Sequence, residues 1–115
     1  MTGAQEHDIQ AQILRHLETR GHRHWHWFAI PNAGKRSLRM GARMKREGMK
    51  AGVADLCFMC PRGVCCWMET KTAKGRQSDA QKGFQAICNR LDHPYALVRS
   101  LDEAIEVLDR WGVLR

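Results

Sequence analysis

Asp55, Glu69 and Lys71 have residue types and a spacing that suit chemistry on a phosphate ester. Two acids can hold a hard cation such as Mg²⁺, which prefers carboxylates together with phosphate oxygens and water. Such a cation polarises a phosphoryl oxygen and activates a water molecule. Lys71 can orient that water or stabilise the charge that develops on the phosphate. In the alternative reading, Asp55 only begins a strand and the other two occupy an exposed polar face.

The geometry of this trio depends on a β-hairpin. The predicted hairpin has two β-prone runs, residues 55–60 and 64–71, joined by a loop over residues 61–63. A three-residue loop with glycine last closes hairpins, and here it places Asp55 opposite Glu69. Opposed Cβ atoms lie about 5 Å apart, where two carboxylates repel by about 3 kcal/mol at an effective dielectric near 20. Positive charge must therefore compensate the pair, part of it from Lys71 on the same face and the rest from a divalent metal.

The other elements follow from hydrophobic spacing and from breakers. Ile9, Ile13 and Leu17 recur at helical spacing, and Ser100 with Glu103 forms the pattern of a capping box. The expected helices cover 6–20, 77–91 and 100–111, and the expected strands cover 24–30, 55–60, 64–71 and 94–99. This order predicts an α/β fold with a mixed sheet flanked by helices, in one domain over residues 1–115.

Residues 32–52 carry a high density of positive charge. The basic residues are Lys35, Arg36, Arg39, Arg43, Lys45, Arg46 and Lys50, against one acid, Glu47. If residues 37–49 form a helix, Arg39, Arg43, Arg46 and Lys50 share one face. The chain as a whole carries a net charge of +7, which favours a polyanionic partner such as nucleic acid. We therefore assign the segment, together with Lys74, to DNA contacts; the alternative is a solvated basic face.

Cysteine and histidine clusters suggest a second kind of metal site. The cysteines are Cys57, Cys60, Cys65, Cys66 and Cys88. An odd number without a secretory signal argues against disulfides. Cys57 and Cys60 have a spacing found in zinc sites, but in a strand they point to opposite faces, so we expect reduced, buried thiols. His22, His24 and His26 alternate onto one strand face, which we interpret as a polar face near DNA or a dimer surface, with a metal face as the alternative.

The N-terminal segment bears on localisation. Residues 1–12 are polar and lack the apolar core of a signal peptide, and no run of 18 apolar residues is present. We therefore expect a protein of the reducing cytoplasm, with no membrane partner.

The acidic hairpin resembles a known family. Gly52-Val53-Ala54-Asp55-Leu56, followed by Glu69-Thr70-Lys71, is similar to the PD-(D/E)xK nuclease signature, with Ala54 where the family name has proline. Residues 74–81 (KGRQSDAQ) resemble the extension found in VRR-NUC domains, the virus-type replication and repair nucleases. Residues 6–10 (EHDIQ) match an early helix that carries a glutamate in that subfamily.

The resemblance implies a fold and a set of roles. The fold is a restriction-endonuclease-like core, α-β-β-β-α-β plus a C-terminal helix. The implied metal ligands are Asp55, Glu69, the main-chain carbonyl of Thr70, and Glu6, and the implied catalytic residues also include Lys71 and Gln81. Two of these have simpler explanations as well: Gln81 completes a capping box with Ser78, and an acid such as Glu6 suits a helix N-terminus.

The resemblance also implies an activity. Stand-alone members of this size look like homodimeric, Mg²⁺- or Mn²⁺-dependent endonucleases that cut branched DNA such as four-way junctions, in the cytoplasm of a bacterium or a phage-infected cell. Two alternatives stay open. One is an exonuclease of the same fold, and the other is a non-catalytic nucleic-acid-binding module stabilised by zinc.

Overall fold

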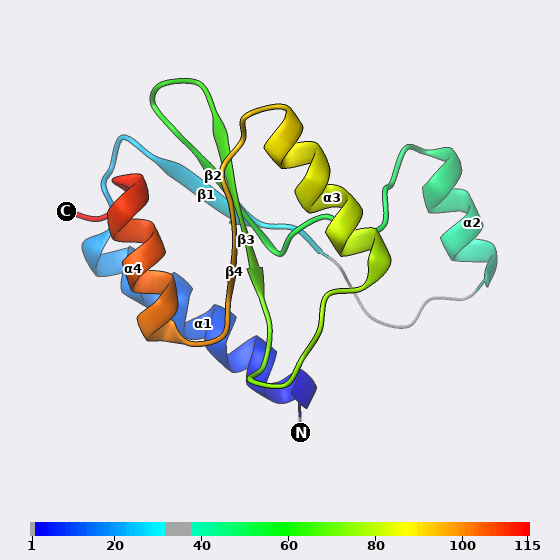
Figure 1. Cartoon of the computed structure of the whole chain (residues 1–115), viewed down its shortest axis with the longest axis horizontal. Coiled ribbons are helices and arrows are strands. Elements are labelled where there is room, and N and C mark those ends of the chain that lie inside the picture. Colours follow the sequence, from blue (N-terminus) through cyan, green and yellow to red (C-terminus); the bar gives the residue numbers. More distant parts are fainter. Residues whose placement is uncertain (1, 32–37) are drawn as a thin grey trace.

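The structure, a computed structural model, is built around a four-stranded sheet in the order β1-β2-β3-β4 (Figure 1). It describes residues 2–31 and 38–115, so Lys35 and Arg36 lie outside the described residues. The strands are β1 (His26–Ala29), β2 (Leu56–Met59), β3 (Cys65–Thr70) and β4 (Tyr95–Val98). The first three strands are antiparallel and β4 runs parallel to β3. The predicted mixed sheet is therefore confirmed.

Helices cover both faces of this sheet. They are α1 (Thr2–Arg20), α2 (Leu38–Arg46), α3 (Asp79–Arg90) and α4 (Leu101–Trp111). In Figure 1, α1 and α4 lie together on one side of the sheet and α3 lies on the other, while α2 projects away beyond α3. The α-β-β-β-α-β order with a C-terminal helix is the predicted one, and the added helix α2 falls in the basic segment.

The main core lies between the sheet and the pair α1–α4. Ile13 and Leu17 of α1 pack there against Leu56, Phe58 and Met68, and all five side chains are almost completely buried. Leu56 and Phe58 are two positions apart in β2, so their side chains lie on the same face of the sheet. Burial of each such side chain contributes roughly 1.5–3 kcal/mol, which holds the strands that carry the acidic residues.

The predicted hairpin register is confirmed. Leu56 pairs with Met68 and Met59 pairs with Cys65. The Cys60 amide donates to the Val64 carbonyl at 2.9 Å, which continues the same register into the loop. At the open end of the hairpin, the same register continued by one residue beyond the Leu56–Met68 pair places Asp55 opposite Glu69.

The helix in the basic segment ends earlier than expected. It stops at Arg46, because Gly48 takes a left-handed conformation with φ of 100°. The Gly48 amide donates to the Lys45 carbonyl at 3.0 Å and the Met49 amide to the Met44 carbonyl at 2.9 Å. This is the hydrogen-bond pattern of a Schellman motif. The helix in this segment is therefore shorter than residues 37–49, and Lys50 does not share a helical face with the arginines.

One of the two predicted capping boxes, the one at Ser100, also differs in detail. Ser100 caps α4 by accepting from the Glu103 amide at 3.1 Å, as expected. The Glu103 carboxylate, however, accepts from the amide of Arg99 at 2.7 Å and not from that of Ser100.

Within the described ranges, none of the helices combines the length and apolar character needed to cross a membrane.

Candidate active site

Asp55 is anchored to the neighbouring strand. Its Oδ2 accepts from the amide of Thr70 at 2.8 Å and from the Thr70 hydroxyl at 3.0 Å. Thr70 is itself buried at the end of β3. These two bonds fix the Asp55 carboxylate beside the strand that carries Glu69. Because the acceptor is charged, they are stronger than hydrogen bonds between neutral groups.

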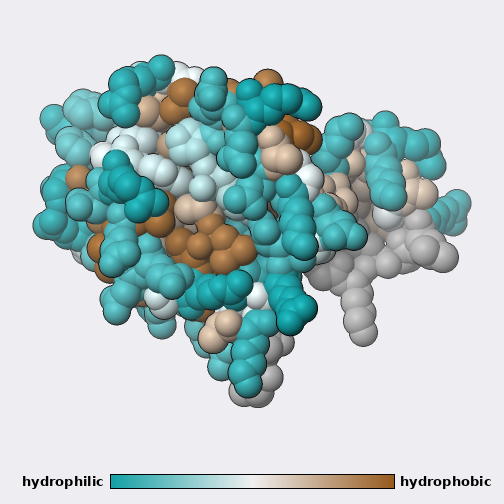
Figure 2. Space-filling model, in the orientation of Figure 1, coloured by the Kyte–Doolittle hydropathy of each residue, from teal (hydrophilic) through white to brown (hydrophobic). Residues whose placement is uncertain are grey.

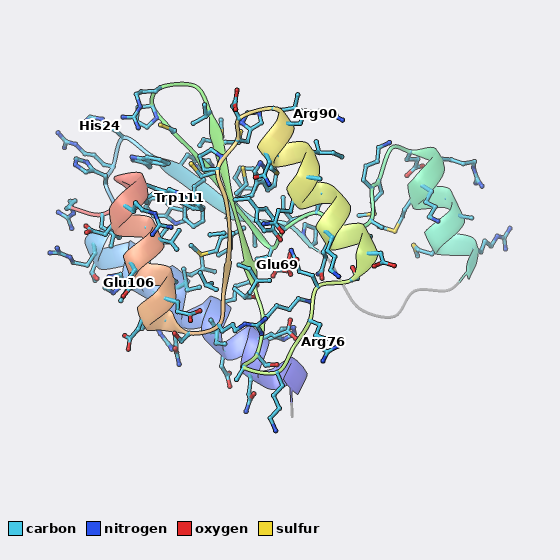
Figure 3. The ribbon with its side chains drawn as sticks, viewed as in Figure 1. His24, Glu69, Arg76, Arg90, Glu106 and Trp111 are labelled. Atoms are coloured by element: carbon cyan, nitrogen blue, oxygen red, sulfur yellow. The ribbon has the colours of Figure 1, made fainter. Side chains whose placement is uncertain are left out.

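Glu69 is a buried acid with one satisfied oxygen and one unsatisfied oxygen. Its side chain is only 2% exposed and lies between β3 and α3 (Figure 3). Oε2 accepts from the Gln81 amide nitrogen at 3.1 Å. Oε1 is buried without a hydrogen-bond partner in the part of the chain that the structure describes. Such an atom is costly unless a cation or a proton compensates it.

The electrostatics of this cluster follow from burial and from the facing acid. Burial, followed by the charge of Asp55, raises the pKa of Glu69 from 4.5 to about 8. Lys71 opposes this rise in pKa and Glu6 adds to it. Asp55, Lys71 and Glu6 therefore all lie within electrostatic reach of Glu69, and the facing carboxylates interact strongly, as like charges do.

The donor set fits a hard divalent cation that keeps open coordination positions. Among residues 2–31 and 38–115, no three His, Cys, Asp or Glu side chains converge into a ready-made metal cage. The cluster instead offers two carboxylates and the bare Oε1 of Glu69. Mg²⁺ is commonly held by one or two carboxylates, with water and phosphate oxygens in the other positions. Glu6 adds negative charge to this site, but it does not complete a group of three close ligands.

Gln81 both caps α3 and contacts Glu69. Its side-chain oxygen accepts from the Ser78 main-chain amide at 2.8 Å, and the main-chain amide of Gln81 donates to the Ser78 hydroxyl oxygen at 3.1 Å. This is the complete capping box that begins α3. The remaining amide nitrogen of the side chain donates to Glu69. The cap therefore orients Gln81 toward the acidic pair.

Arg99 is a residue of this region that the sequence reasoning missed. Its Nη1 donates to the carbonyls of Thr72 at 2.6 Å and Gly75 at 2.7 Å. The amide of Lys71 also donates to the Val98 carbonyl at 3.0 Å. Arg99 thus braces the loop that directly follows Lys71. No motif marked it, because it is only the residue after the last strand and its partners are main-chain carbonyls distant in sequence.

The braced loop presents two further cations. Lys74, predicted to contact DNA, is exposed there, and so is Arg76, which was not predicted. Figure 3 shows Arg76 on the loop before α3, at the end of the molecule where α1 begins. Arg76 lies within the motif of residues 74–81, and its positive charge there could have predicted a phosphate contact.

The basic segment lies on the other side of α3. Arg39, Arg43, Lys45 and Arg46 are exposed on α2, and Lys50 is exposed on the loop that follows. Arg43 pairs with Glu47 at 3.2 Å in an exposed i,i+4 contact, which contributes little to stability. Figure 2 shows a mainly hydrophilic surface over α2. The contacts of these cations with DNA remain a prediction.

The cysteines are free thiols. Cys57, Cys60, Cys66 and Cys88 are buried, as expected, and Cys65 is half-buried. Burial, with smaller contributions from neighbouring thiols, raises the pKa of Cys57 to about 12 and that of Cys66 to about 11. The exposed rings of His22 and His24 stack at 5.7 Å. Neither cluster forms a metal-binding group within the described residues, so the zinc alternative gains no support.

A mixed β1-β2-β3-β4 sheet with acids at adjoining strand ends and helices on both faces defines a PD-(D/E)xK-like fold, as predicted. The chain shares this fold with a solved structure described as "VRR_NUC domain protein". The two superpose with a TM-score of 0.74 over 92% of this chain and 86% of that chain, at 18% sequence identity. No family model matches the sequence, and no curated protein matches it. The likeness establishes that this chain has the fold of a VRR-NUC domain.

Proposed function

We propose that this protein is a divalent-metal-dependent nuclease that hydrolyses phosphodiester bonds in DNA. The observation that carries the proposal is the buried Oε1 of Glu69, which lacks a hydrogen-bond partner among the described residues and belongs to a side chain coupled to Asp55. The shared fold with a VRR_NUC domain protein supports the same class of activity. The net charge of +7 favours a polyanionic substrate.

Asp55 and Glu69 would hold the metal, Mg²⁺ or Mn²⁺, with the main-chain carbonyl of Thr70 as a third ligand and Glu6 acting on the metal or its water. When bound, the metal polarises the phosphoryl oxygen and activates water. Thr70 fixes the Asp55 carboxylate and Gln81 fixes Glu69. The chain thereby holds both acids in place before any ligand binds, so little reorganisation is needed.

Lys71 is the proposed catalytic cation. Its ammonium group donates to the attacking water or to a non-bridging phosphate oxygen, where negative charge grows as water adds to phosphorus and the ester P–O bond breaks. The attacking water releases a proton to solvent, and the leaving oxygen takes one up from solvent. Arg99 holds the loop after Lys71 through three main-chain carbonyls, those of Thr72, Ala73 and Gly75. Arg99 therefore acts as a positioning residue.

Exposed cations flank the acidic pair on two sides and are the proposed phosphate contacts. On one side they are Arg39, Arg43, Lys45, Arg46 and Lys50, and on the other Lys74 and Arg76. A substrate held on both sides need not be a straight duplex, and branched DNA such as a four-way junction is the proposed preference. Two symmetric cuts would call for a homodimer, which sedimentation velocity can test.

The proposal is tested by cleavage of four-way junction, flap and linear duplex DNA with Mg²⁺, Mn²⁺ or EDTA. Asp55→Asn and Lys71→Met should each lower the cleavage rate by a factor on the order of 100 or more. Asp109→Asn, an equivalent change at an exposed site on α4, should cut like the wild type. Cleavage that persists in EDTA, or that is undiminished in both site variants, would reject the proposal.

A covalently closed circular DNA separates the two modes of cutting. An endonuclease opens the circle, whereas an exonuclease leaves it intact and degrades only the linear form. Equal rates on branched and linear DNA would reject the branched preference without touching the nuclease proposal.

A further inference from the structure

A cavity of about 480 Å³ lies between α3 and the loop that leads into β2. Its lining residues are Lys50, Ala51, Val53, Ala80, Gly83, Phe84 and Ile87. All of them except Lys50 are small or apolar. Figure 2 shows the corresponding apolar surface over α3, on the side toward α2. The volume falls in the range of sites that take one small organic group.

Both walls of this cavity lead directly to the acidic pair. Val53 on the loop wall lies two residues before Asp55 in the sequence. Ala80 on the helix wall precedes Gln81, which donates to Glu69. Gly52 joins the walls, since a Cβ at this position, where φ is 87°, would lie 2.3 Å from the Ala80 carbonyl oxygen. The cavity therefore adjoins the acidic pair along both of its walls.

The chemistry of the lining selects a flat aromatic group that carries negative charge outside the cavity. Phe84 is held edge-on by Trp67 at a centroid distance of 5.1 Å and by Tyr95 at 6.3 Å, so its ring is a fixed platform for stacking. Lys50 adds one cation to the lining, and the exposed cations of α2 lie nearby along the chain. A nucleobase with its attached phosphate matches this combination.

We infer that the cavity binds an unpaired nucleobase of the DNA strand at the active centre, an inference that rests on the proposed nuclease function. A base stacked inside a duplex cannot enter such a cavity without leaving its partner, whereas a base in a single-stranded flap is already unpaired. The cavity thereby selects DNA with an unpaired nucleotide beside the cut, and it needs no particular base, because every base has a stacking face.

Gly83 offers a way to block the cavity without disturbing the fold. A Cβ added there meets no heavy atom within 4 Å, and glycine within a helix is less favourable than other residues. Gly83→Leu therefore fills the cavity from a helix that tolerates the change. Ala86→Leu makes a matching change at an exposed position of α3 outside the lining.

The test is equilibrium binding in EDTA, without cleavage, of DNA that carries 2-aminopurine at an unpaired position or at the same position in a full duplex. The wild type should quench the unpaired probe and bind it roughly tenfold or more tightly than the duplex. Gly83→Leu should lose both the quenching and the preference, and Ala86→Leu should keep them. A preference that survives in Gly83→Leu would overturn the inference.

The outcomes separate this inference from the proposed function. Quenching by a protein that never cuts DNA would reject the nuclease proposal and still support the base site. Cleavage with an unchanged preference in Gly83→Leu would reject only the base site. A change of sedimentation in Gly83→Leu, with DNA preference intact, would assign the cavity to contact between copies of the chain and overturn the inference.

Discussion

Replacing Glu69 by glutamine should stabilise the metal-free protein and abolish its response to divalent cations. Glutamine has the same shape and cannot ionise. Its oxygen can accept from Gln81, as Glu69 Oε2 does at 3.1 Å, and its amide can donate toward Asp55. The substitution therefore removes the buried charge while it keeps the packing, which is the condition for interpreting a stability change as electrostatic.

The magnitude follows from the pKa of Glu69, which burial and then Asp55 raise from 4.5 to about 8. An acid whose pKa is raised by folding stabilises the native state fully below the unfolded value, and this stability is lost as pH rises through the folded value. The loss reaches about 3 kcal/mol at pH 7, with a limiting slope of roughly 1.4 kcal/mol per pH unit. Glu69→Gln removes this loss, so its melting temperature at pH 7 should exceed that of the wild type by about 10 °C.

The assay is thermal unfolding at pH 5 and pH 8, in EDTA and in a Mg²⁺ titration. In EDTA the two proteins should differ little at pH 5 and most at pH 8. Mg²⁺ should stabilise the wild type increasingly with concentration, because a ligand that binds only the native state shifts the equilibrium toward it, and should leave Glu69→Gln unchanged. Glu106→Gln, at an exposed position of α4, should track the wild type. Lower stability of Glu69→Gln at pH 8 in EDTA, or equal Mg²⁺ stabilisation of both proteins, would refute the reasoning.

Three further predictions concern the loop brace, the basic helix and the thiols. Arg99→Lys keeps the charge but loses contacts to partly buried carbonyls, so unfolding free energy should fall by about 1–3 kcal/mol and kcat should fall more than KM rises; an unchanged kcat would leave Arg99 a purely structural brace. The double change Arg39→Ala and Arg46→Ala should lower the slope of log binding constant against log salt concentration by about 2, measured by fluorescence anisotropy, whereas Arg110→Ala on α4 should not. At pH 8 a thiol-specific disulfide reagent should leave Cys57, whose pKa burial raises to about 12, unmodified until denaturant is added; rapid modification of native Cys57 would contradict its burial.

The acidic centre was predictable because its geometry is local. The loop over residues 61–63 sets the hairpin register, and the register alone brings Asp55 opposite Glu69. The helix start at Ser78 is also local, since a serine with glutamine three residues later forms the observed capping box. Contacts that depend on a few neighbouring residues leave a pattern that can be recognised in the sequence.

The contacts that were not predicted are those between distant segments or between competing local partners. Arg99 reaches carbonyls 24 and 27 residues away, and main-chain carbonyls have no sequence signature. Glu103 had two amides within reach and bonds Arg99 instead of Ser100. The end of α2 at Gly48 was visible as a glycine, but the charge pattern across it suggested a longer helix.

Gln81, which caps the start of α3, also determines which oxygen of Glu69 lacks a hydrogen-bond partner. The side-chain oxygen of Gln81 accepts from the Ser78 amide. The NH₂ group of the same side chain therefore faces Glu69 and donates to its Oε2. Asp55 is turned toward Thr70, and its negative charge acts on Glu69. These orientations leave Oε1 of Glu69 to be compensated from outside the chain, by a proton in the metal-free protein and by a divalent cation when one binds.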